Sequence, residues 1–132
     1  MDAQSIAVAE ACLYGAETGA LSFPEIVGKL IEAGFEGYHI DYRRGTATYV
    51  GPDGDSVELK GITLPVAASF EAAGVAAAVR EAQTNAPGYT YRGFSEKVTA
   101  AGCAGYIVSF PGRRVLYYGR TAETHVEHFP DR

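Results

Sequence analysis

Two segments near the N-terminus carry apolar residues at the spacing of a helix. The apolar positions of the first segment are Ile6, Ala9, Leu13 and Ala16. Those of the second segment are Phe23, Ile26, Val27, Leu30 and Ile31. Because apolar residues three or four positions apart share one helix face, both segments are predicted to be amphipathic helices. Ser22 and Glu25 have the spacing of a capping box, which starts the second helix. Gly34 supplies the left-handed residue that ends it.

After the second helix the pattern changes to strict alternation. Tyr38, Ile40 and Tyr42 alternate with His39 and Asp41, which is typical of a half-buried strand. Turn-forming residues separate this strand from two more segments of extended character. These two segments are predicted at 46–50 and 56–59. The first half of the chain is therefore predicted to be two helices followed by three antiparallel strands.

The same order of elements recurs in the second half. The run Ala-Gly-x-x-Gly-Tyr occurs at 33–38 and again at 101–106, an offset of 68 residues. The matching strands are predicted at 106–110, 114–118 and 124–129. We therefore predict an α/β fold in the broad sense, more specifically α+β, because the strands are antiparallel. It is built by internal duplication, with the sheet and the helices packed about a pseudo-twofold axis. Residues 1–132 form one predicted domain, with copy one at about 5–64 and copy two at about 66–130.

Some of the internal matches have other offsets. Phe23 matches Phe94 at an offset of 71, which predicts that the second helix of copy two is three residues shorter. Val57-Glu58 matches Val126-Glu127 at an offset of 69. The segment at 85–92 has no counterpart in copy one and is predicted to be a loop five residues longer than its equivalent.

Composition and charge exclude several classes of partner. The formal net charge of the 132 residues is −5 at pH 7. We expect no nucleic-acid partner, because phosphate contacts need concentrated Lys and Arg, and no membrane association, because anionic lipids repel an acidic surface. Residues 1–4 lack the basic segment of a signal peptide, so we expect a cytoplasmic protein. Cys12 and Cys103 are expected to be separate buried thiols.

Several motifs resemble those of a known family. They are the Phe-Pro-Glu-Ile-Val helix start at 23–27, the Ala-Gly-x-x-Gly-Tyr-x-x-Asp run at 33–41, Thr48-Tyr49, and the stretch from Tyr117-Tyr118-Gly119 to Val126-Glu127. In these motifs the chain resembles domain-of-unknown-function family 1398, whose small bacterial and phage members are sometimes labelled phage envelope-like. The resemblance covers nearly the whole chain and implies no activity.

Candidate catalytic chemistry rests on two pairs of polar residues. His39 with Asp41 and His125 with Glu127 are each two positions apart on a predicted strand, so both members of a pair lie on one face. Imidazole and carboxylate can bind a divalent metal or carry out general acid–base chemistry. The alternative is that both pairs are ordinary polar residues on the outer face of half-exposed strands. We expect no dedicated metal site and no cofactor.

Candidate ligand-binding residues gather around the extra segment at 85–92. It contains Tyr89, Tyr91 and Arg92, and tyrosine suits an apolar pocket that needs a few hydrogen bonds. In a ligand-binding protein these side chains would face the inner-strand residues Tyr42 and Tyr106, with Arg92 available to an anionic group.

Three hypotheses for function follow from these residues. The first is a small-molecule-binding or regulatory domain without strong catalytic machinery. The second is a protein-interaction module or homodimer that acts through a strand edge or an apolar patch. The third is a metal-assisted hydrolase or lyase that uses His39, Asp41, His125 and Glu127. The sequence favours a protein that is not an enzyme, either a monomer or a homodimer.

Overall fold

The computed structural model describes residues 1–130, which form four helices and six strands. The helices are α1 (Ala3–Thr18), α2 (Phe23–Glu32), α3 (Ala72–Gln83) and α4 (Tyr91–Ala100). The strands are β1 (Gly37–Asp41), β2 (Thr46–Val50), β3 (Ser56–Lys60), β4 (Cys103–Ser109), β5 (Arg114–Gly119) and β6 (Thr124–His128). All six strands join one antiparallel sheet in the order β3-β2-β1-β4-β5-β6. The predicted α+β class with an antiparallel sheet is confirmed.

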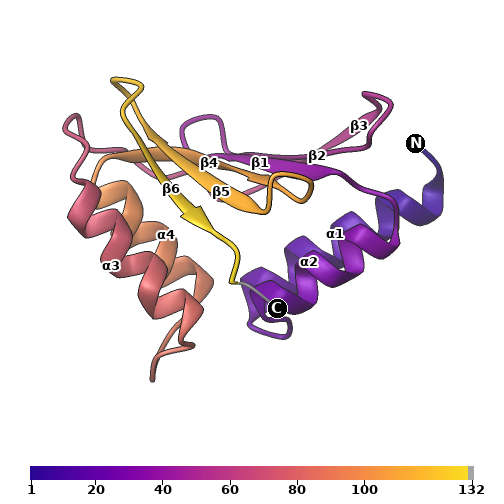
Figure 1. Ribbon diagram of the computed structural model, residues 1–132, viewed down its shortest axis with the longest axis horizontal. Helices are drawn as coiled ribbons and strands as arrows, with labels where there is room; N and C mark the ends of the chain where they lie inside the picture. Colours follow the sequence, from indigo (N-terminus) through magenta and orange to yellow (C-terminus); the bar gives the residue numbers. More distant parts are fainter. Residues whose placement is uncertain (131–132) are drawn as a thin grey trace.

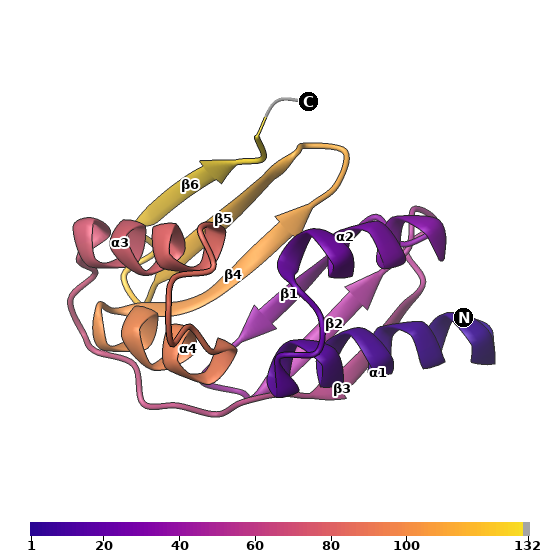
Figure 2. The same ribbon diagram turned by 90° about the horizontal axis from the view of Figure 1, so that it is seen from below.

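The sheet and the helices form two layers. All four helices lie on one face of the sheet, the lower face in Figure 1, and no helix of residues 1–130 covers the upper face. Figure 2 shows the helix layer in front, with α1 beside α2 and α3 beside α4. Side chains on the lower face are therefore buried between sheet and helices, while those on the upper face are left to solvent or to a partner. Below, the two are called the inner and the outer face.

Local signals place the helix ends where the sequence predicts them in the first half. The hydroxyl of Ser22 accepts from the Glu25 amide at 3.3 Å, and the Glu25 carboxylate accepts from the Ser22 amide at 2.9 Å. This is the predicted capping box. Gly34 and Gly102 follow α2 and α4 with φ of +94° and +90°, which confirms that both adopt the left-handed conformation.

The start of α4 differs from the prediction. The Thr90 hydroxyl accepts from the Gly93 amide at 2.9 Å, so α4 begins at Tyr91 and not at Phe94. Both α2 and α4 have ten residues, and the predicted shortening is wrong. Tyr91 and Arg92 lie in the first helical turn instead of a loop. The connection 84–90 has seven residues against four at 19–22, a difference of three and not five.

Equivalent turns of the two halves are related by a constant shift of 68 residues. Gly51 donates to the Asp55 carbonyl, and Gly119 donates to the Glu123 carbonyl, each at 2.8 Å. The N-caps Ser22 and Thr90 have the same offset. These correspondences support the duplication, which stays a prediction until the two halves are superposed.

The register of β6 departs from the sequence match. Tyr49 pairs with Val57 in the first half, whereas the equivalent Tyr117 pairs with His125. Val126 is therefore not the counterpart of Val57, and the offset of 69 is wrong by one residue. Since a one-residue slip moves every side chain to the other face, this shift decides where the polar residues of β6 point.

Candidate functional site

The inner face carries the aromatic network that the sequence predicts to surround a ligand. The Tyr91 hydroxyl lies 2.8 Å from the hydroxyl of Tyr106, and the Tyr42 hydroxyl lies 2.9 Å from that of Ser95. Tyr42 is completely buried and Tyr106 is nearly so. Three of the predicted residues thus come together between the sheet and α4.

Burial dominates the chemistry of this network. Burial raises the pKa of Tyr42, Tyr91 and Tyr106 above the ordinary tyrosine value of 10.0. All three phenols are therefore neutral at physiological pH and act as hydrogen-bonding core residues.

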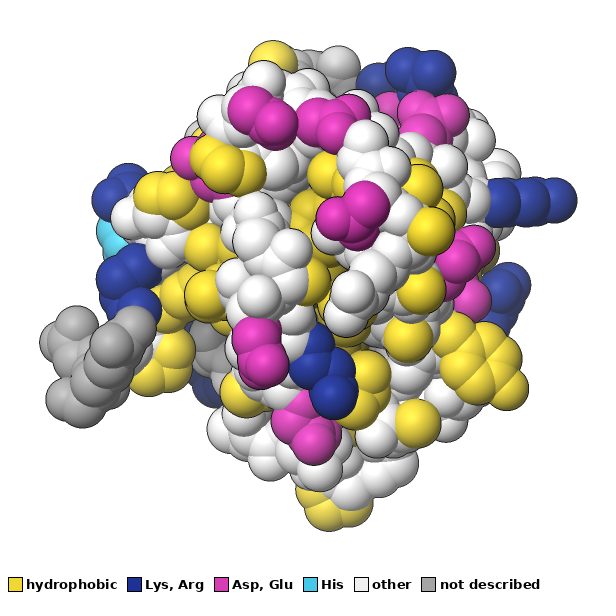
Figure 3. Space-filling view, turned by 90° about the vertical axis from the view of Figure 1, so that its right-hand side faces the viewer, with side chains coloured by type: hydrophobic (Ala, Val, Ile, Leu, Met, Phe, Trp, Pro, Cys, Tyr) yellow, Lys and Arg dark blue, Asp and Glu magenta, His cyan; other side chains and the backbone are white. Residues whose placement is uncertain are grey.

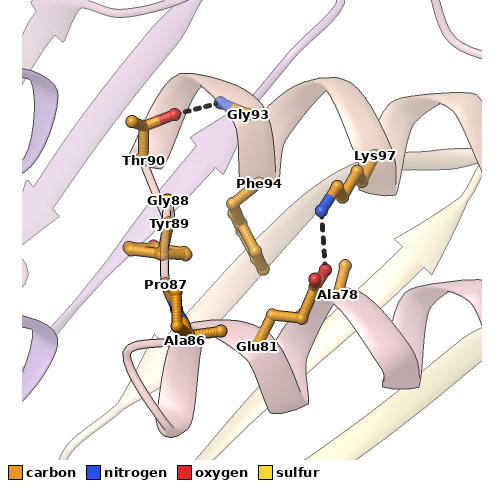
Figure 4. A pocket seen from close by; sticks show the side chains of 10 residues that line it. All are labelled: Ala78, Glu81, Ala86, Pro87, Gly88, Tyr89, Thr90, Gly93, Phe94 and Lys97. Atoms are coloured by element: carbon orange, nitrogen blue, oxygen red, sulfur yellow. Dashed lines mark hydrogen bonds and ion pairs between the residues drawn. The ribbon is translucent and has the colours of Figure 1, made fainter.

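The other two predicted residues lie apart from the network. Arg92 is exposed on α4, and its Nε lies 3.8 Å from a carboxylate oxygen of Glu96 one turn further on. Tyr89 lines a cavity of about 60 Å³ between α3 and α4. Figure 4 shows this cavity, with the Glu81 to Lys97 ion pair of 2.8 Å across its side. Since a single ordered water needs at least roughly 10–15 Å³ of such space, the cavity can hold water.

A larger hollow of about 370 Å³ lies at the N-terminal end of α1. It is lined in part by three carboxylates, those of Asp2, Asp53 and Asp55. Asp55 pairs with the amino group of Met1, and Asp2 accepts from the Ser5 amide at 2.7 Å. Two of the carboxylates are thus already engaged in local structure, and the hollow opens widely to solvent.

The four candidate catalytic residues do not converge. Register places His39 and Asp41 on the outer face and His125 and Glu127 on the inner face, with β4 and β5 between the two strands. The interpretation as outer-face polar residues therefore holds for the first pair and is wrong for the second, because of the shifted register of β6. Within residues 1–130, no three His, Cys, Asp or Glu side chains are grouped so that they could hold a metal ion.

The hydrogen-bonding capacity of the His125 ring is poorly satisfied. Its Nε2 is buried and has no hydrogen-bond partner among the described residues. The nearest carboxylate oxygen, on Glu127, is 3.6 Å away, which is too long for a hydrogen bond. A polar side chain therefore occupies a position where Val57 lies in the first half.

The outer face changes from polar to apolar along the row of residues that crosses the middle of the six strands. Directly opposed residues of an antiparallel sheet share a face, so the strand pairings define this row. From β3 to β6 it reads Glu58, Thr48, His39, Ile107, Leu116 and Val126. The half on β1–β3 is polar and the half on β4–β6 is apolar. Ile107 is 44% exposed, which is unusual for an aliphatic residue in the centre of a sheet.

Beside this row, Tyr118 extends across the sheet. Its hydroxyl lies 2.6 Å from Nε2 of His39, two strands away. The ring passes over Gly105 on β4, where an added Cβ would lie 2.4 Å from the Tyr118 hydroxyl oxygen. The missing side chain at Gly105 therefore lets the ring lie along the sheet. The sequence analysis missed Tyr118, although its place in the strand pattern opposite to the buried Tyr117 could have indicated an outward position.

Charge differs between the β4–β6 half of the outer face and the side of the molecule near the N-terminus. Acidic side chains are spread over the side of the molecule near the N-terminus (Figure 3). On β4–β6, by contrast, the outward positions carry no carboxylate in the described strands. These positions are Gly105, Ile107, Ser109, Arg114, Leu116, Tyr118, Thr124, Val126 and His128. We call the outward side chains of Ile107, Leu116, Val126, Tyr118 and Arg114 the outer patch.

Comparison of the chain with protein-family models and with curated proteins finds no match. The resemblance to family 1398 therefore stays an expectation. Among the described residues, no helix combines the length and the apolar character needed to cross a membrane.

Proposed function

We propose that this protein is an interaction module that self-associates through the outer patch. The observation that carries the proposal is the uncovered apolar run of Ile107, Leu116 and Val126 across three neighbouring strands. Apolar side chains gain free energy when they leave water, and an uncovered sheet face supplies several of them in one plane.

Charge favours a second copy of the chain as the partner. With a net charge of −5, two copies repel each other through most of their surfaces. The outward positions of β4–β6 hold no acidic residue, so two molecules meet there without opposing carboxylates. Two sheets can then stack face to face about 10 Å apart, as in a β-sandwich.

The size of the patch sets the expected affinity. Strands lie about 4.8 Å apart and rise about 3.3 Å per residue, so three strands of five residues cover roughly 250 Å² of sheet. Stable complexes bury about 800 Å² of accessible surface on each partner. We therefore expect a weak dimer, with a dissociation constant on the order of tens of micromolar.

Sedimentation over a concentration series tests the proposal. We expect the wild type to pass from monomer to dimer between about 1 µM and about 1 mM, as that affinity requires. Ile107→Lys should stay monomeric, because it buries a charge in the apolar run. Ile31→Lys, the same change at an aliphatic side chain that is 51% exposed on α2 in the helix layer, is the matched control and should dimerise. A wild type that is monomeric at every concentration, or an Ile107→Lys variant that dimerises normally, refutes the proposal.

A second candidate function is binding of a small ligand at the α3–α4 hairpin. The cavity beside Tyr89, one of the predicted ligand-binding residues, favours it. Its weakness is volume, since typical ligand sites measure about 300–1,000 Å³. A fragment screen followed by NMR tests it. Binding should shift the resonances of Tyr89 and Lys97, and Tyr89→Ala should abolish those shifts.

A further inference from the structure

We infer that two copies stack face to face about a twofold axis that lies between their sheets. The axis passes over Leu116 and runs perpendicular to the strands, so that Arg114 of the partner subunit packs on the Tyr118 ring of each copy. This inference rests on the proposed self-association and adds the arrangement of the two molecules and the contact that selects it.

Tyr118 is held in place before any partner arrives. The hydrogen bond of 2.6 Å to His39 fixes the far end of the side chain, and Gly105 leaves room for the ring beneath it. Tyr118 is half-buried in this position, so part of its ring stays exposed. The π-face of a tyrosine attracts a guanidinium group, and little rotamer entropy is lost because the side chain is already ordered.

Arg114 can supply that guanidinium group. It is exposed on β5, and its Nε donates to the Gly112 carbonyl at 3.0 Å. This bond turns the side chain back toward its own hairpin and leaves the Nη atoms without a partner among residues 1–130. Arg114 and Tyr118 are each two residues from Leu116, on either side of it along the same face.

This spacing distinguishes two possible arrangements. An axis through Leu116 parallel to the strands places Arg114 opposite Arg114 of the partner subunit, and like charges repel. An axis perpendicular to the strands reverses the strand direction and places Arg114 opposite Tyr118 of the partner subunit. Both interactions then form twice, as an isologous interface requires.

The neighbouring strand fits the same arrangement. On β6 the outward residues on either side of Val126 are Thr124 and His128. The perpendicular axis brings the Thr124 hydroxyl near His128 of the partner subunit, where a hydrogen bond can form. The parallel axis places β6 opposite β4 of the partner subunit and brings His128 near Ser109 of the partner subunit. Polar groups at the rim can therefore pair in both arrangements, and the contact between Arg114 and Tyr118 is what distinguishes them.

Cross-linking with a short bismaleimide tests the arrangement. We compare Arg114→Cys alone, Tyr118→Cys alone, and an equimolar mixture of the two, at a concentration where the wild type is dimeric. The native thiols of Cys12 and Cys103 are buried and provide no reactive background. We expect the mixture to cross-link several times faster than either variant alone. Fastest cross-linking in Arg114→Cys alone overturns the inference.

A double-mutant cycle gives a second measurement that does not depend on cysteines. Arg114→Ala and Tyr118→Leu should each weaken the dimer about tenfold, because each removes two cation–π contacts. The double variant should be no weaker than either single variant, since all three lose the same contacts. Additive losses overturn the inference. The proposed function has a separate test, because it fails only when the wild type does not dimerise or Ile107→Lys leaves dimerisation unchanged.

Discussion

The two edge strands of the sheet, β3 and β6, have opposite patterns. In β3 the apolar Val57 and Leu59 face the helices, and Glu58 faces outward. In β6 the polar His125 and Glu127 face the helices, while Val126 faces outward. The same position in the fold thus carries an ordinary amphipathic strand in one half and an inverted strand in the other.

This inversion confines the difference between the two inner faces to the edge of the sheet and leaves the centre alike. The inner tyrosines Tyr38 and Tyr49 have the equivalents Tyr106 and Tyr117, and all four are buried. Inward-pointing polar residues on an edge strand discourage further strands from adding to that edge. An outward apolar residue instead adds apolar surface to the face of the sheet, which favours association there. The inverted β6 therefore favours association through the face of the sheet over association through its edge.

The largest expected effect tests what the halves share. Six tyrosines contribute hydroxyls to the core, three from each half, and burial raises the pKa of each above 10.0. They are Tyr38, Tyr42, Tyr49, Tyr91, Tyr106 and Tyr117. Because the unfolded chain loses these protons first, stability is intact below pH 10 and falls as the pH rises above it. The slope approaches about 8 kcal/mol per pH unit for six such groups.

Tyrosinate absorbance and circular dichroism, followed together during alkaline titration, check this expectation. We expect the buried tyrosines to ionise together with loss of secondary structure in one steep transition. Ionisation of all tyrosines near their ordinary pKa of 10.0 in a protein that stays folded contradicts the buried network.

The next largest effect compares two equivalent glycines. Gly34 and Gly102 have nearly the same positive φ, but an added Cβ at Gly34 meets nothing within 4 Å. At Gly102 it would lie 2.0 Å from the Ser69 carbonyl oxygen. Gly34→Ala should cost about 0.5–1 kcal/mol, because the backbone strain of alanine exceeds the entropy that glycine loses on folding. Gly102→Ala should cost roughly 3–5 kcal/mol, since the connection at 61–71 must also move.

Urea unfolding of the two variants measures the difference. Equal losses of stability would show that the segment around Ser69 moves aside at little cost in free energy. The two helix ends would then tolerate alanine equally.

A smaller effect tests the inversion of β6 directly. His125→Val gives the second half the residue of the first and removes a buried nitrogen that has no hydrogen-bond partner within residues 1–130. We expect a gain of about 1 kcal/mol in the free energy of unfolding. The reciprocal change, Val57→His, should lose about 1–2 kcal/mol. If His125→Val destabilises the protein instead, the interaction with Glu127 contributes more than the unpaired nitrogen costs.

The sequence predicts a feature of this fold well where nearby residues determine it, and poorly where the pairing of distant strands determines it. The start of α2 follows from Ser22 and Glu25, and the ends of α2 and α4 follow from glycines, because each signal acts within a few residues. The start of α4 does not follow from the Phe23 and Phe94 match. A local cap at Thr90 overrides that similarity.

The candidate site was predicted less well for the same reason. Tyr42 and Tyr106 face inward as alternation along the strands predicts, whereas Tyr91 reaches Tyr106 from the first turn of α4. The orientation of His125 depends on the register between β5 and β6, and a match of two residues at an offset of 69 gave the wrong register. The outer patch needs the order of all six strands, which periodicity along the chain does not contain.

The smallest expected effect compares the two turns that precede the edge strands. Gly54 and Ala122 hold equivalent positions, with φ of +86° and +65°. Each donates to the carbonyl of the glycine three residues earlier, Gly51 or Gly119, at 3.1 and 3.0 Å. Alanine in this conformation costs about 1–2 kcal/mol, whereas glycine costs more entropy on folding. Ala122→Gly should therefore raise the free energy of unfolding by about 0.5–1 kcal/mol. Gly54→Ala should lower it by a similar amount, and thermal unfolding of both variants measures the pair. If Ala122→Gly proves neutral or destabilising, the second turn is not equivalent to the first, and the constant offset of 68 ends before β6.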